Sequence, residues 1–483
     1  MQVAFPLTQI EYRRRTPEQE VLYDVLRAHL ATFLAQTESE CGGLPEYVEK
    51  ELSEYLRCGI LGYGFVRMRC NDCGKSVAVA FSCKGRGFCP SCTGRRMADT
   101  SARLVDDVFA TQAPVRQWVL SLPFQIRYRL SSDSRLHGEV LAVFLRVVQG
   151  WYRRKGREAG IIDTLGGTVT FAQRFGSALN LNPHFHSLAL DGVFNTRSNV
   201  FHEAPPVTDA DVKQIVETTA RRVIKLLRKR GVLNENDYDD FSDAQPVLSA
   251  LASASIKGLV ATGDRSGRVV RRVLSDPAEG VKTAALCYAS RGFSLHAATR
   301  IAAGDKAGLE RLCNYVARPP LAAGSLKQLS DEAYSFKLKT PWDDGTTHLI
   351  FSPMELIEKL AALVPPPRVN LIRYHGVFAP HTKNRAAYVP KKPAPEELEK
   401  TRGKSANRLL WAALLARTFG LNMEVCAHCG GKMRFVAALT DPASIKAYLD
   451  GVGLPSAIPE IAPARPPPQM ELDYIDIDCD EGA

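Results

Sequence analysis

The chain has 483 residues, 45% of them hydrophobic, which is enough for two to four domains with real cores and argues against a disordered protein. No apolar run reaches the ~18 residues of a membrane span, and the first residues lack the apolar segment of a secretory signal. Lys and Arg number 62 against 52 Asp and Glu, and the excess is clustered. We therefore expect a globular cytoplasmic protein that binds a polyanion, most simply nucleic acid.

The first half of the chain alternates helical and strand patterns. Residues 16 to 58 carry apolar side chains at helical spacing, and Val115 to Phe124 is a compact β-prone run that ends at a proline. Ser134 to Arg154 predicts a long amphipathic helix. Gly167 to Phe175 and His184 to Phe194 predict two strands joined by a polar loop, which together form a β-hairpin.

The second half is less regular. Helices are expected over Asp209 to Lys229 and over Lys306 to Ala317, where two prolines follow, and a hairpin is expected to turn at Asp344-Gly345. Residues 233 to 290 have no clear pattern. Lys391 to Lys404 has the composition of a linker, and the Pro-rich and then acidic tail from Pro455 predicts disorder.

Several of the twelve cysteines lie in C-x-x-C pairs, which in a chain without a secretory signal favours metal binding over disulfides. Cys70 and Cys73 are separated from Cys89 and Cys92 by fifteen residues, the pattern C-x2-C-x15-C-x2-C. Two such turns supply the four thiolates of a structural Zn²⁺ site and leave no open coordination position. Cys58 and Cys83 lie close enough in sequence to replace one of the four.

A further C-x-x-C turn, Cys426-Ala-His-Cys429, has no obvious partner in the sequence. It supplies half of a metal site. It could borrow a ligand such as His428, but an ordinary turn without metal is the interpretation we favour.

His184 and His186 are two residues apart in a predicted strand, so both side chains project from the same face of the sheet. Two such imidazoles can bind one divalent ion if a third ligand comes from the neighbouring strand. Gln173 lies where the predicted hairpin would place it alongside His184. The alternative is that both histidines are ordinary hydrogen-bonded polar side chains, but the preceding Pro183 favours a built site.

A metal held by two histidines and one amide leaves positions open for substrate oxygens and acts as a Lewis acid on a phosphodiester. Such a site needs a nucleophile. Tyr315 is the best candidate, because Arg311 and Arg318 flank it on a predicted helix and their charges would attract a phosphate.

Four stretches together are similar to one known family: CNDCGKSVAVAFSCKGRGFCPSC, LNLNPHFHSLALDGVF, GFSLHAATRIAAGDKAGLERLCNYVARPP and RYHGVFAPH. They resemble, in the same order and from about Leu56 to Pro390, the rolling-circle transposases of the insertion-sequence-91 type, which are HUH single-strand transposases. The resemblance implies an α+β fold, with an HUH nuclease domain built on an antiparallel sheet flanked by helices and an N-terminal helical and zinc-ribbon domain. Its catalytic residues fall on His184, His186 and Tyr315.

The resemblance implies four parts of the chain. Residues 1–110 would be the helical and zinc-binding domain, and 111–325 the nuclease domain with the tyrosine helix. Residues 326–392 would extend the catalytic core, and 393–483 would hold the C-terminal helical and C-x-x-C segment with its tail.

Founding members of this family have two tyrosines four residues apart. Here Arg311 stands four residues before Tyr315 and Pro319 four residues after it. The chain therefore resembles a single-tyrosine variant, in which one tyrosine would serve both strand ends. Tyr374 is the runner-up nucleophile, although a structural role suits it better.

The expected activity is cleavage and rejoining of single-stranded DNA at the ends of a mobile element through a 5′-phosphotyrosine. Mg²⁺ or Mn²⁺ would be held by His184, His186 and Gln173, and Zn²⁺ would be structural. The expected location is the bacterial cytoplasm, on the nucleoid when the protein is bound to DNA, as a monomer or a homodimer. The side chains expected to contact DNA are Arg67, Arg69, Lys84, Arg86, Arg95, Arg96, Arg311 and Arg318.

Three alternatives remain at this point. A rolling-circle replication initiator or a relaxase would use the same chemistry. A non-catalytic, zinc-dependent DNA-binding protein would explain the cysteines and the charge but not the two histidines. A hydrolase of small phosphate esters would not need the basic surface.

Overall fold

The computed structural model describes residues 15–233, 245–274, 285–322, 324–383, 385–389 and 425–465. The expected linker over 391–404 and the end of the expected tail lie outside these residues. No helix within the described ranges combines the length and the apolar character that crossing a membrane requires. This agrees with the absence of a long apolar run in the sequence.

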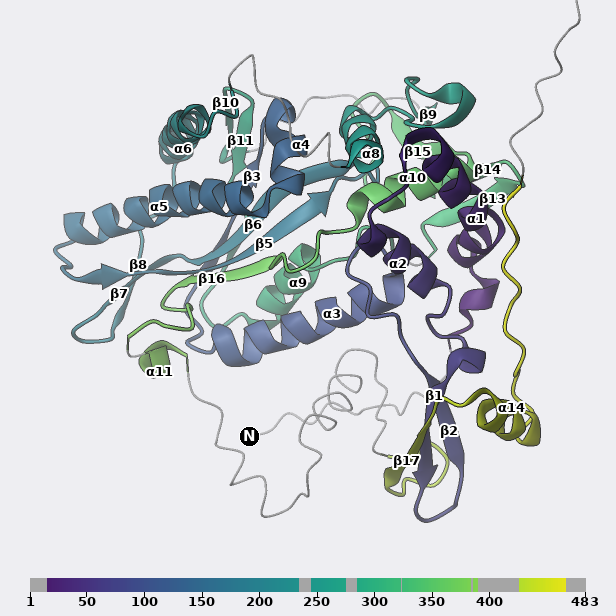
Figure 1. Cartoon of the computed structure of the whole chain (residues 1–483). Coiled ribbons are helices and arrows are strands. Elements are labelled where there is room, and N and C mark those ends of the chain that lie inside the picture. Colours follow the sequence, from purple (N-terminus) through teal and green to yellow (C-terminus); the bar gives the residue numbers. More distant parts are fainter. Residues whose placement is uncertain are drawn as a thin grey trace, which may run out of the picture.

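A seven-stranded antiparallel sheet forms the centre of the molecule (Figure 1). Six strands follow one another in the order β10-β11-β3-β6-β5-β16, and β12 pairs with the remaining part of β3. The two strands with the candidate metal ligands therefore lie in the interior of the sheet. The strands are β3 (Val115–Ser121), β5 (Gly167–Phe175), β6 (Leu181–Leu190), β10 (Cys287–Ser290), β11 (Phe293–His296), β12 (Arg300–Ile301) and β16 (Ile372–Gly376).

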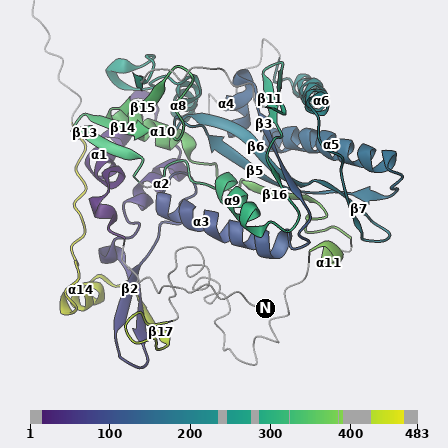
Figure 2. The same cartoon turned by 180° about the vertical axis from the view of Figure 1, so that it is seen from behind.

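Helices cover both faces of this sheet (Figures 1 and 2). On one face, α5 (Ser134–Glu158) and α6 (Asp209–Lys229) pack on Trp118, Phe185 and Ala189. The other face packs on a shorter layer that places the tyrosine helix over the strands. That layer consists of α3 (Pro90–Arg103), the π-helical turn η3 (Leu104–Val108) and α9 (Lys306–Val316).

A buried ion pair fixes the register of β3 and β6. The guanidinium of Arg116 donates to both carboxylate oxygens of Asp191 at 2.9 and 3.0 Å, and the hydroxyl of Tyr152 donates to the same carboxylate at 2.9 Å. Trp118 in turn donates its indole N–H to that hydroxyl. A buried pair tolerates no slip, because a slip would leave a charge unpaired.

A second core lies at one end of the sheet and joins the N-terminal helices to a four-stranded antiparallel sheet with the order β13-β14-β15-β9. Ser352 and Glu355 form a capping box at the start of its central helix, α10. The elements are η1 (Pro17–Gln19), α1 (Val21–Cys41), α2 (Glu46–Tyr55), α4 (Phe124–Ser132), α8 (Pro246–Lys257), η4 (Gly263–Arg265), β9 (Arg271–Leu274), β13 (Leu326–Ser330), β14 (Ala333–Lys337), β15 (Thr346–Phe351) and α10 (Pro353–Leu363).

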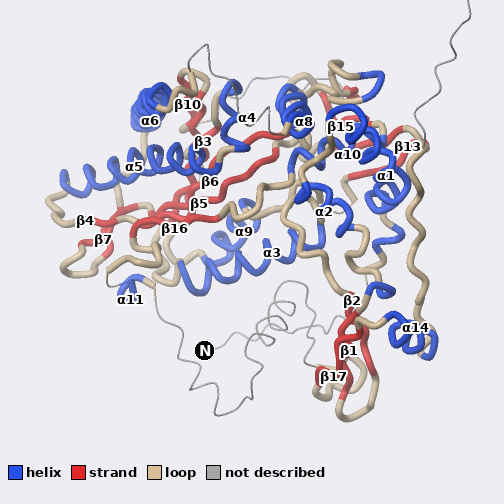
Figure 3. Tube along the Cα trace, in the orientation of Figure 1, coloured by secondary structure: helices blue, strands red, loops and turns tan. Residues whose placement is uncertain are grey.

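A small three-stranded sheet projects from the rest of the molecule (Figures 1 and 3). Its strands β1 (Phe65–Cys70) and β2 (Ser76–Ala80) follow η2 (Leu61–Tyr63), whereas β17 (Met433–Leu439) comes from the far end of the chain and pairs with β1. Helix α14 (Pro442–Gly451) packs on Phe65 through Ile445 and Leu449. The remaining elements are β4 (Thr164–Leu165), β7 (Gly192–Asn195), β8 (Phe201–Glu203) and α11 (Arg385–Tyr388).

The expected α+β class, with antiparallel sheets and helices, is confirmed. The expected helices over 134–154, 209–229 and 306–317 are present within a few residues. Strand β6 begins three residues before His184, at the buried Leu181, because that residue pairs with Phe175. The stretch 233–290, which had no clear pattern, contains α8, β9 and the first strand of the central sheet, β10.

Candidate active site and metal centres

The two histidines of β6 point the same way from the sheet, as the alternation of a strand requires. The Nε2 atoms of His184 and His186 are 3.0 Å apart. Phe185, between them, faces the opposite layer and packs on His137 at 4.8 Å between ring centroids. Two nitrogens about 2.1 Å from one ion and at right angles to each other lie about 3.0 Å apart, so the spacing fits adjacent ligands of an octahedral ion.

The outer nitrogens of both rings have partners that orient them. The Nδ1 atom of His184 is 2.7 Å from the carbonyl oxygen of Asn182, so it donates and leaves the lone pair on Nε2. The Nδ1 atom of His186 is 2.8 Å from the side-chain amide nitrogen of Gln117, on the neighbouring strand β3. With this amide turned by 180°, its oxygen would accept a proton from Nδ1 and leave the lone pair on Nε2. Such partners fix ring orientation and tautomer in metal sites.

Burial keeps both imidazoles neutral. It lowers the pKa of His186 to about 2, with further contributions from His184 and Arg318. Burial also lowers the pKa of His184, although the contact with the Asn182 carbonyl opposes this shift. Neutral imidazoles keep the lone pairs that a cation needs.

Gln173 lies directly opposite His184 in the register of β5 and β6. Its Nε2 donates to the carbonyl oxygen of Val316 at 2.6 Å, at the end of the tyrosine helix. Its Oε1 is buried and has no hydrogen-bond partner among the described residues. Within the described residues, no third His, Cys, Asp or Glu side chain lies close enough to complete a metal site with the two histidines. The unpartnered amide oxygen therefore fits the donor set of a divalent ion.

Tyr315 lies on α9 directly above this pair. Its ring is 5.9 Å from the ring of His186, centroid to centroid, and the two planes are nearly perpendicular at 84°. The side chain is 40% exposed, although α9 is otherwise packed on the sheet. Two cations lie over its ring: the guanidinium of Arg318 at 4.8 Å and the ammonium of Lys339 at 4.5 Å.

An open cleft of about 570 Å³ lies between Tyr315 and His186. Tyr315, His186 and Gln117 line it together with Arg311, one helical turn before the tyrosine. His296, on β11, also lines it. The cleft therefore brings the side chains of Tyr315, His186 and Arg311 to one open space.

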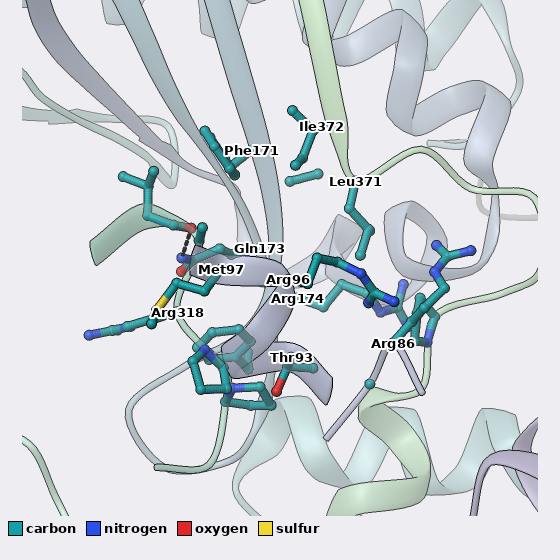
Figure 4. A pocket seen from close by; sticks show the side chains of 18 of the residues that line it. Arg86, Thr93, Arg96, Met97, Phe171, Gln173, Arg174, Arg318, Leu371 and Ile372 are labelled. Carbon is teal, nitrogen blue, oxygen red and sulfur yellow. Dashed lines mark hydrogen bonds between the residues drawn. The ribbon is translucent and has the colours of Figure 1, made fainter. Parts of the chain in front are cut away.

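A second, smaller cavity of about 100 Å³ lies on the other side of Gln173, between α3 and β5 (Figure 4). Arg86, Arg96, Arg174 and Arg318 contribute to its lining, and the rest is mostly apolar. The arginines are close enough to affect one another. Burial and the charge of Arg96 lower the pKa of Arg86, and burial lowers the pKa of Arg174 to about 10. An anion would relieve this concentration of positive charge.

The first cysteine cluster, which we call the core cysteine cluster, consists of Cys58, Cys83, Cys89 and Cys92. Its Sγ atoms are 3.4 to 3.7 Å apart where they touch, and most of the cluster is buried beside the N-terminal helices. The backbone N–H of Gly85 donates to the Sγ of Cys83 at 3.4 Å.

The second cluster, the ribbon cysteine cluster, consists of Cys70, Cys73, Cys426 and Cys429. The Sγ atoms of Cys70 and Cys429 are 3.5 Å apart, and those of Cys73 and Cys426 are 3.6 Å apart. Positive φ angles at Gly74 (73°) and Gly430 (75°) let the chain turn behind each C-x-x-C pair.

These clusters correct two predictions. Cys70 and Cys73 do not share a site with Cys89 and Cys92, because the β1–β2 hairpin carries the first pair away from the second. The C-x-x-C turn at Cys426 is not an ordinary turn, because the pairing of β17 with β1 brings it to Cys70 and Cys73. Cys58 and Cys83, rather than Cys70 and Cys73, complete the site of Cys89 and Cys92.

Both clusters fit Zn²⁺. A tetrahedral ion with Zn–S bonds of about 2.3 Å places its sulfur ligands about 3.8 Å apart, close to the distances here. Contacts with Cys58 and Cys83 lower the pKa of the Cys92 thiol, whereas thiol neighbours and burial raise the pKa of Cys89. Four thiols in contact cannot all ionise without a cation, so each cluster is a structural zinc site.

The residues expected to contact DNA fall on two separate surfaces. Arg67 and Arg69 lie on β1 of the projecting sheet, where the guanidinium of Arg67 stacks on Tyr448 of α14 at 4.8 Å. Of the others, Arg86, Arg96 and Arg318 line the smaller cavity beside the central sheet and Arg311 lines the open cleft. Lys84 and Arg86 lie on the loop of the core cysteine cluster, Arg95 and Arg96 on α3, Arg311 on α9, and Arg318 just after it.

Two family comparisons agree with this arrangement. Residues 25–122 match the family model "Transposase zinc-binding domain" of the IS91 type (Zn_Tnp_IS91), and residues 167–386 match the family model "Putative transposase" (Y2_Tnp). The first includes the core cysteine cluster, and the second includes His184, His186 and Tyr315. This chain is an IS91-type transposase. No curated protein and no solved structure matches the chain.

The transposase is thus a DNA-processing enzyme that binds DNA and contains structural zinc. Sequence reasoning missed three residues of its site: Gln117, His296 and Lys339. A polar amide within the β-prone run Val115 to Leu120 was a visible signal for Gln117. His296 lies on β11 and Lys339 in the loop after β14, and only the tertiary structure brings both beside Tyr315.

Proposed function

We propose that the transposase cuts and rejoins single-stranded DNA at the ends of its mobile element, as an HUH-type nuclease with Tyr315 as the nucleophile. One observation carries this proposal. The Nε2 atoms of His184 and His186 converge to 3.0 Å, and the ring of Tyr315 lies 5.9 Å from that of His186 in the same open cleft. A cation-binding pair beside an exposed phenol is what phosphodiester cleavage requires.

His184, His186 and the Oε1 atom of Gln173 would hold Mg²⁺ or Mn²⁺, which would polarise the scissile phosphate when bound. The Gln117 amide and the Asn182 carbonyl orient the imidazoles toward it. Gln173 has a second effect, because its bond to the Val316 carbonyl ties β5 to the end of the tyrosine helix. Such positioning keeps the phenol in reach of the phosphate.

The proposed reaction exchanges one phosphodiester for another. The Oη atom of Tyr315 bonds to the phosphorus while the bond to the 3′ oxygen breaks; the phenol proton leaves to solvent, and the 3′ oxygen gains a proton. A second 3′-OH then attacks the phosphotyrosine and restores the phenol. One ester replaces another at each step, so no ATP is needed. With Arg311 and Pro319 in place of a second tyrosine, Tyr315 serves both steps.

The basic side chains form two separate surfaces that would both contact the DNA. Arg86, Arg96, Arg311 and Arg318, around the cleft and its neighbouring cavity, would contact phosphates near the cut. Lys84 and Arg95 extend this surface on the core zinc unit. Arg67 and Arg69, on the projecting zinc-bound sheet, would contact the element end farther away. We expect the protein to act in the bacterial cytoplasm, on the nucleoid.

The test is the covalent adduct. Incubation with labelled single-stranded element ends and Mg²⁺ should give an adduct that survives denaturation, and peptide mapping should place the DNA on Tyr315. Tyr315→Phe should abolish the adduct. Tyr374→Phe, the matched change on β16 of the same sheet, should leave adduct formation unchanged. An adduct that persists in Tyr315→Phe would show that this nucleophile is wrong.

A chelation experiment tests the metal separately. Removal of Mg²⁺ and Mn²⁺ should stop the cleavage while the zinc content of both cysteine clusters stays unchanged. Cleavage that continues without any free divalent ion would contradict the role of the histidine pair. A protein that binds DNA but never forms an adduct would be the non-catalytic regulator instead.

A further inference from the structure

A groove of about 850 Å³ adjoins Tyr315 and shares no other lining residue with the histidine cleft. One wall is the segment after α9, including Arg318, and the end of β5 at Phe175. The other wall is the hairpin of β14 and β15, which contributes Lys337, Lys339 and Trp342. Tyr315 lines both the groove and the cleft. A strand that passes the nucleophile therefore has an open path on each side.

The charge of the groove suits a polyanion. Three positively charged side chains, Arg318, Lys337 and Lys339, line it against a single carboxylate, Asp343. The ammonium of Lys339 and the guanidinium of Arg318 both lie over the Tyr315 ring. The positive charge is therefore concentrated at the end nearest the nucleophile.

The groove also holds an aromatic side chain with a fixed orientation. The indole N–H of Trp342 donates to the hydroxyl of Ser177 at 3.3 Å, and its backbone N–H donates to the Thr346 carbonyl at 3.0 Å. The guanidinium of Arg272 lies 4.9 Å from its ring. Aromatic rings beside a basic track bind single strands, because unpaired bases expose faces for stacking and duplex bases do not.

We propose that this groove holds the single-stranded DNA arm next to the scissile phosphate, with a base stacked on Trp342 and its phosphates on Lys337, Lys339 and Arg318. The identity of the arm as the one next to the cut rests on the proposed nuclease function. The binding of a single strand in the groove does not, since it requires no chemistry.

The first experiment measures stacking in the Tyr315→Phe background, where the proposed cleavage cannot occur. The fluorescence anisotropy of a labelled oligothymidylate gives the Kd. Trp342→Ala should weaken binding by about 5-fold to 100-fold, the range for loss of one stacked base. Trp342→Phe, which keeps an aromatic face, should bind nearly as well as the parent. Equal affinity of the alanine and phenylalanine variants would overturn the proposal.

The second experiment measures charge and does not depend on the tryptophan. Replacing both exposed lysines, Lys337→Ala with Lys339→Ala, should reduce the slope of log K against log salt by about 1.4, about 0.7 for each lost phosphate contact on a single strand. The matched double variant Lys50→Ala with Lys257→Ala removes two exposed lysines outside the groove and should leave the slope unchanged. An unchanged slope in the groove variant would overturn the proposal, as would an equal loss of duplex binding.

The outcomes separate the two proposals. Loss of single-strand affinity in the groove variants, with a wild-type adduct mapped to Tyr315, supports both. An adduct without any effect of Trp342 or the lysines retains the nuclease and removes the groove. Groove-dependent binding without an adduct retains the groove and removes the nuclease.

Discussion

The histidine pair, which is the proposed centre for Mg²⁺ or Mn²⁺, and the two cysteine clusters are built in opposite ways. His184 and His186 lie on one interior strand, between β3 and β5, and their geometry is set by a sheet with its own packed cores on both faces. The ribbon cysteine cluster joins residues as far apart as Cys70 and Cys429, and apart from the pairing of β1 with β17 only two small apolar clusters support it among the described residues. The fold therefore sets the geometry of the histidine pair without an ion, whereas the segments that carry the cysteines depend on bound zinc for their stability.

The difference has an energetic cause. A pair of neutral imidazoles is a tolerable group in a core when each ring has a hydrogen-bond partner. Four thiolates in contact are not tolerable without a cation, so metal binding and folding are coupled there. Perturbations should therefore affect stability at the cysteine clusters and ion affinity at the histidine centre.

The largest effect is expected at the core cysteine cluster. Cys89→Ser removes a buried ligand next to the N-terminal helices and should cost about 4 kcal/mol or more of the free energy of unfolding, because loss of a structural metal is among the most damaging single changes. Thermal unfolding and zinc analysis, with the metal content falling from two ions to one, check this. An unchanged melting temperature would mean that this cluster is not a folding element.

A smaller effect is expected at the ribbon cysteine cluster. Cys429→Ser should also remove one zinc ion, but β17 and α14 pack on β1, β2 and η2 through small apolar clusters. The melting temperature of the main body should fall by no more than about 3 °C, while limited proteolysis should cut faster within residues 425–465. Destabilisation equal to that of Cys89→Ser would show that the projecting sheet supports the whole protein.

At the histidine centre the fold should survive and the ion affinity should change. Gln117→Leu removes the amide that orients His186 and should weaken Mn²⁺ binding by about 10-fold to 100-fold, with zinc content unchanged. Gln149→Leu removes a similar bond, to Thr168, away from the histidines and serves as the control. Equal Mn²⁺ affinities in the two variants would argue against an orienting role for Gln117.

At neutral pH the smallest effect is expected in the sheet below the site, where a change in stability develops only on acidification. Burial lowers the pKa of His137, which packs under Phe185, to about 3 from an ordinary value of 6.5. Between pH 3 and pH 6.5 the imidazole is protonated in the unfolded chain and neutral in the folded chain. Stability is therefore unaffected by this histidine above about pH 6.5 and declines by about 1.4 kcal/mol per pH unit as the pH falls toward 3. His137→Leu should make the free energy of unfolding, measured by chemical denaturation, less dependent on pH in this range. An identical slope against pH in the two proteins would contradict the lowered pKa of His137.

The sequence alone determined the elements whose signals are local. The helices of α5, α6 and α9, the hairpin strands around His184, and the placement of Gln173 opposite that histidine all follow from periodicity and short loops. The common face of the two histidines follows from the pleat of one strand. These features needed no information from distant residues.

Only the tertiary structure decided how the cysteines divide and what surrounds Tyr315. A C-x-x-C turn supplies two thiolates whatever its partner, so spacing could not show that Cys70 and Cys73 join Cys426 and Cys429 while Cys58 and Cys83 join Cys89 and Cys92. Lys339 reaches the Tyr315 ring because the loop after β14, in a separate four-stranded sheet, lines the same groove as Tyr315. Such contacts depend on which surfaces bury one another, and that is a property of the whole chain rather than of any short stretch.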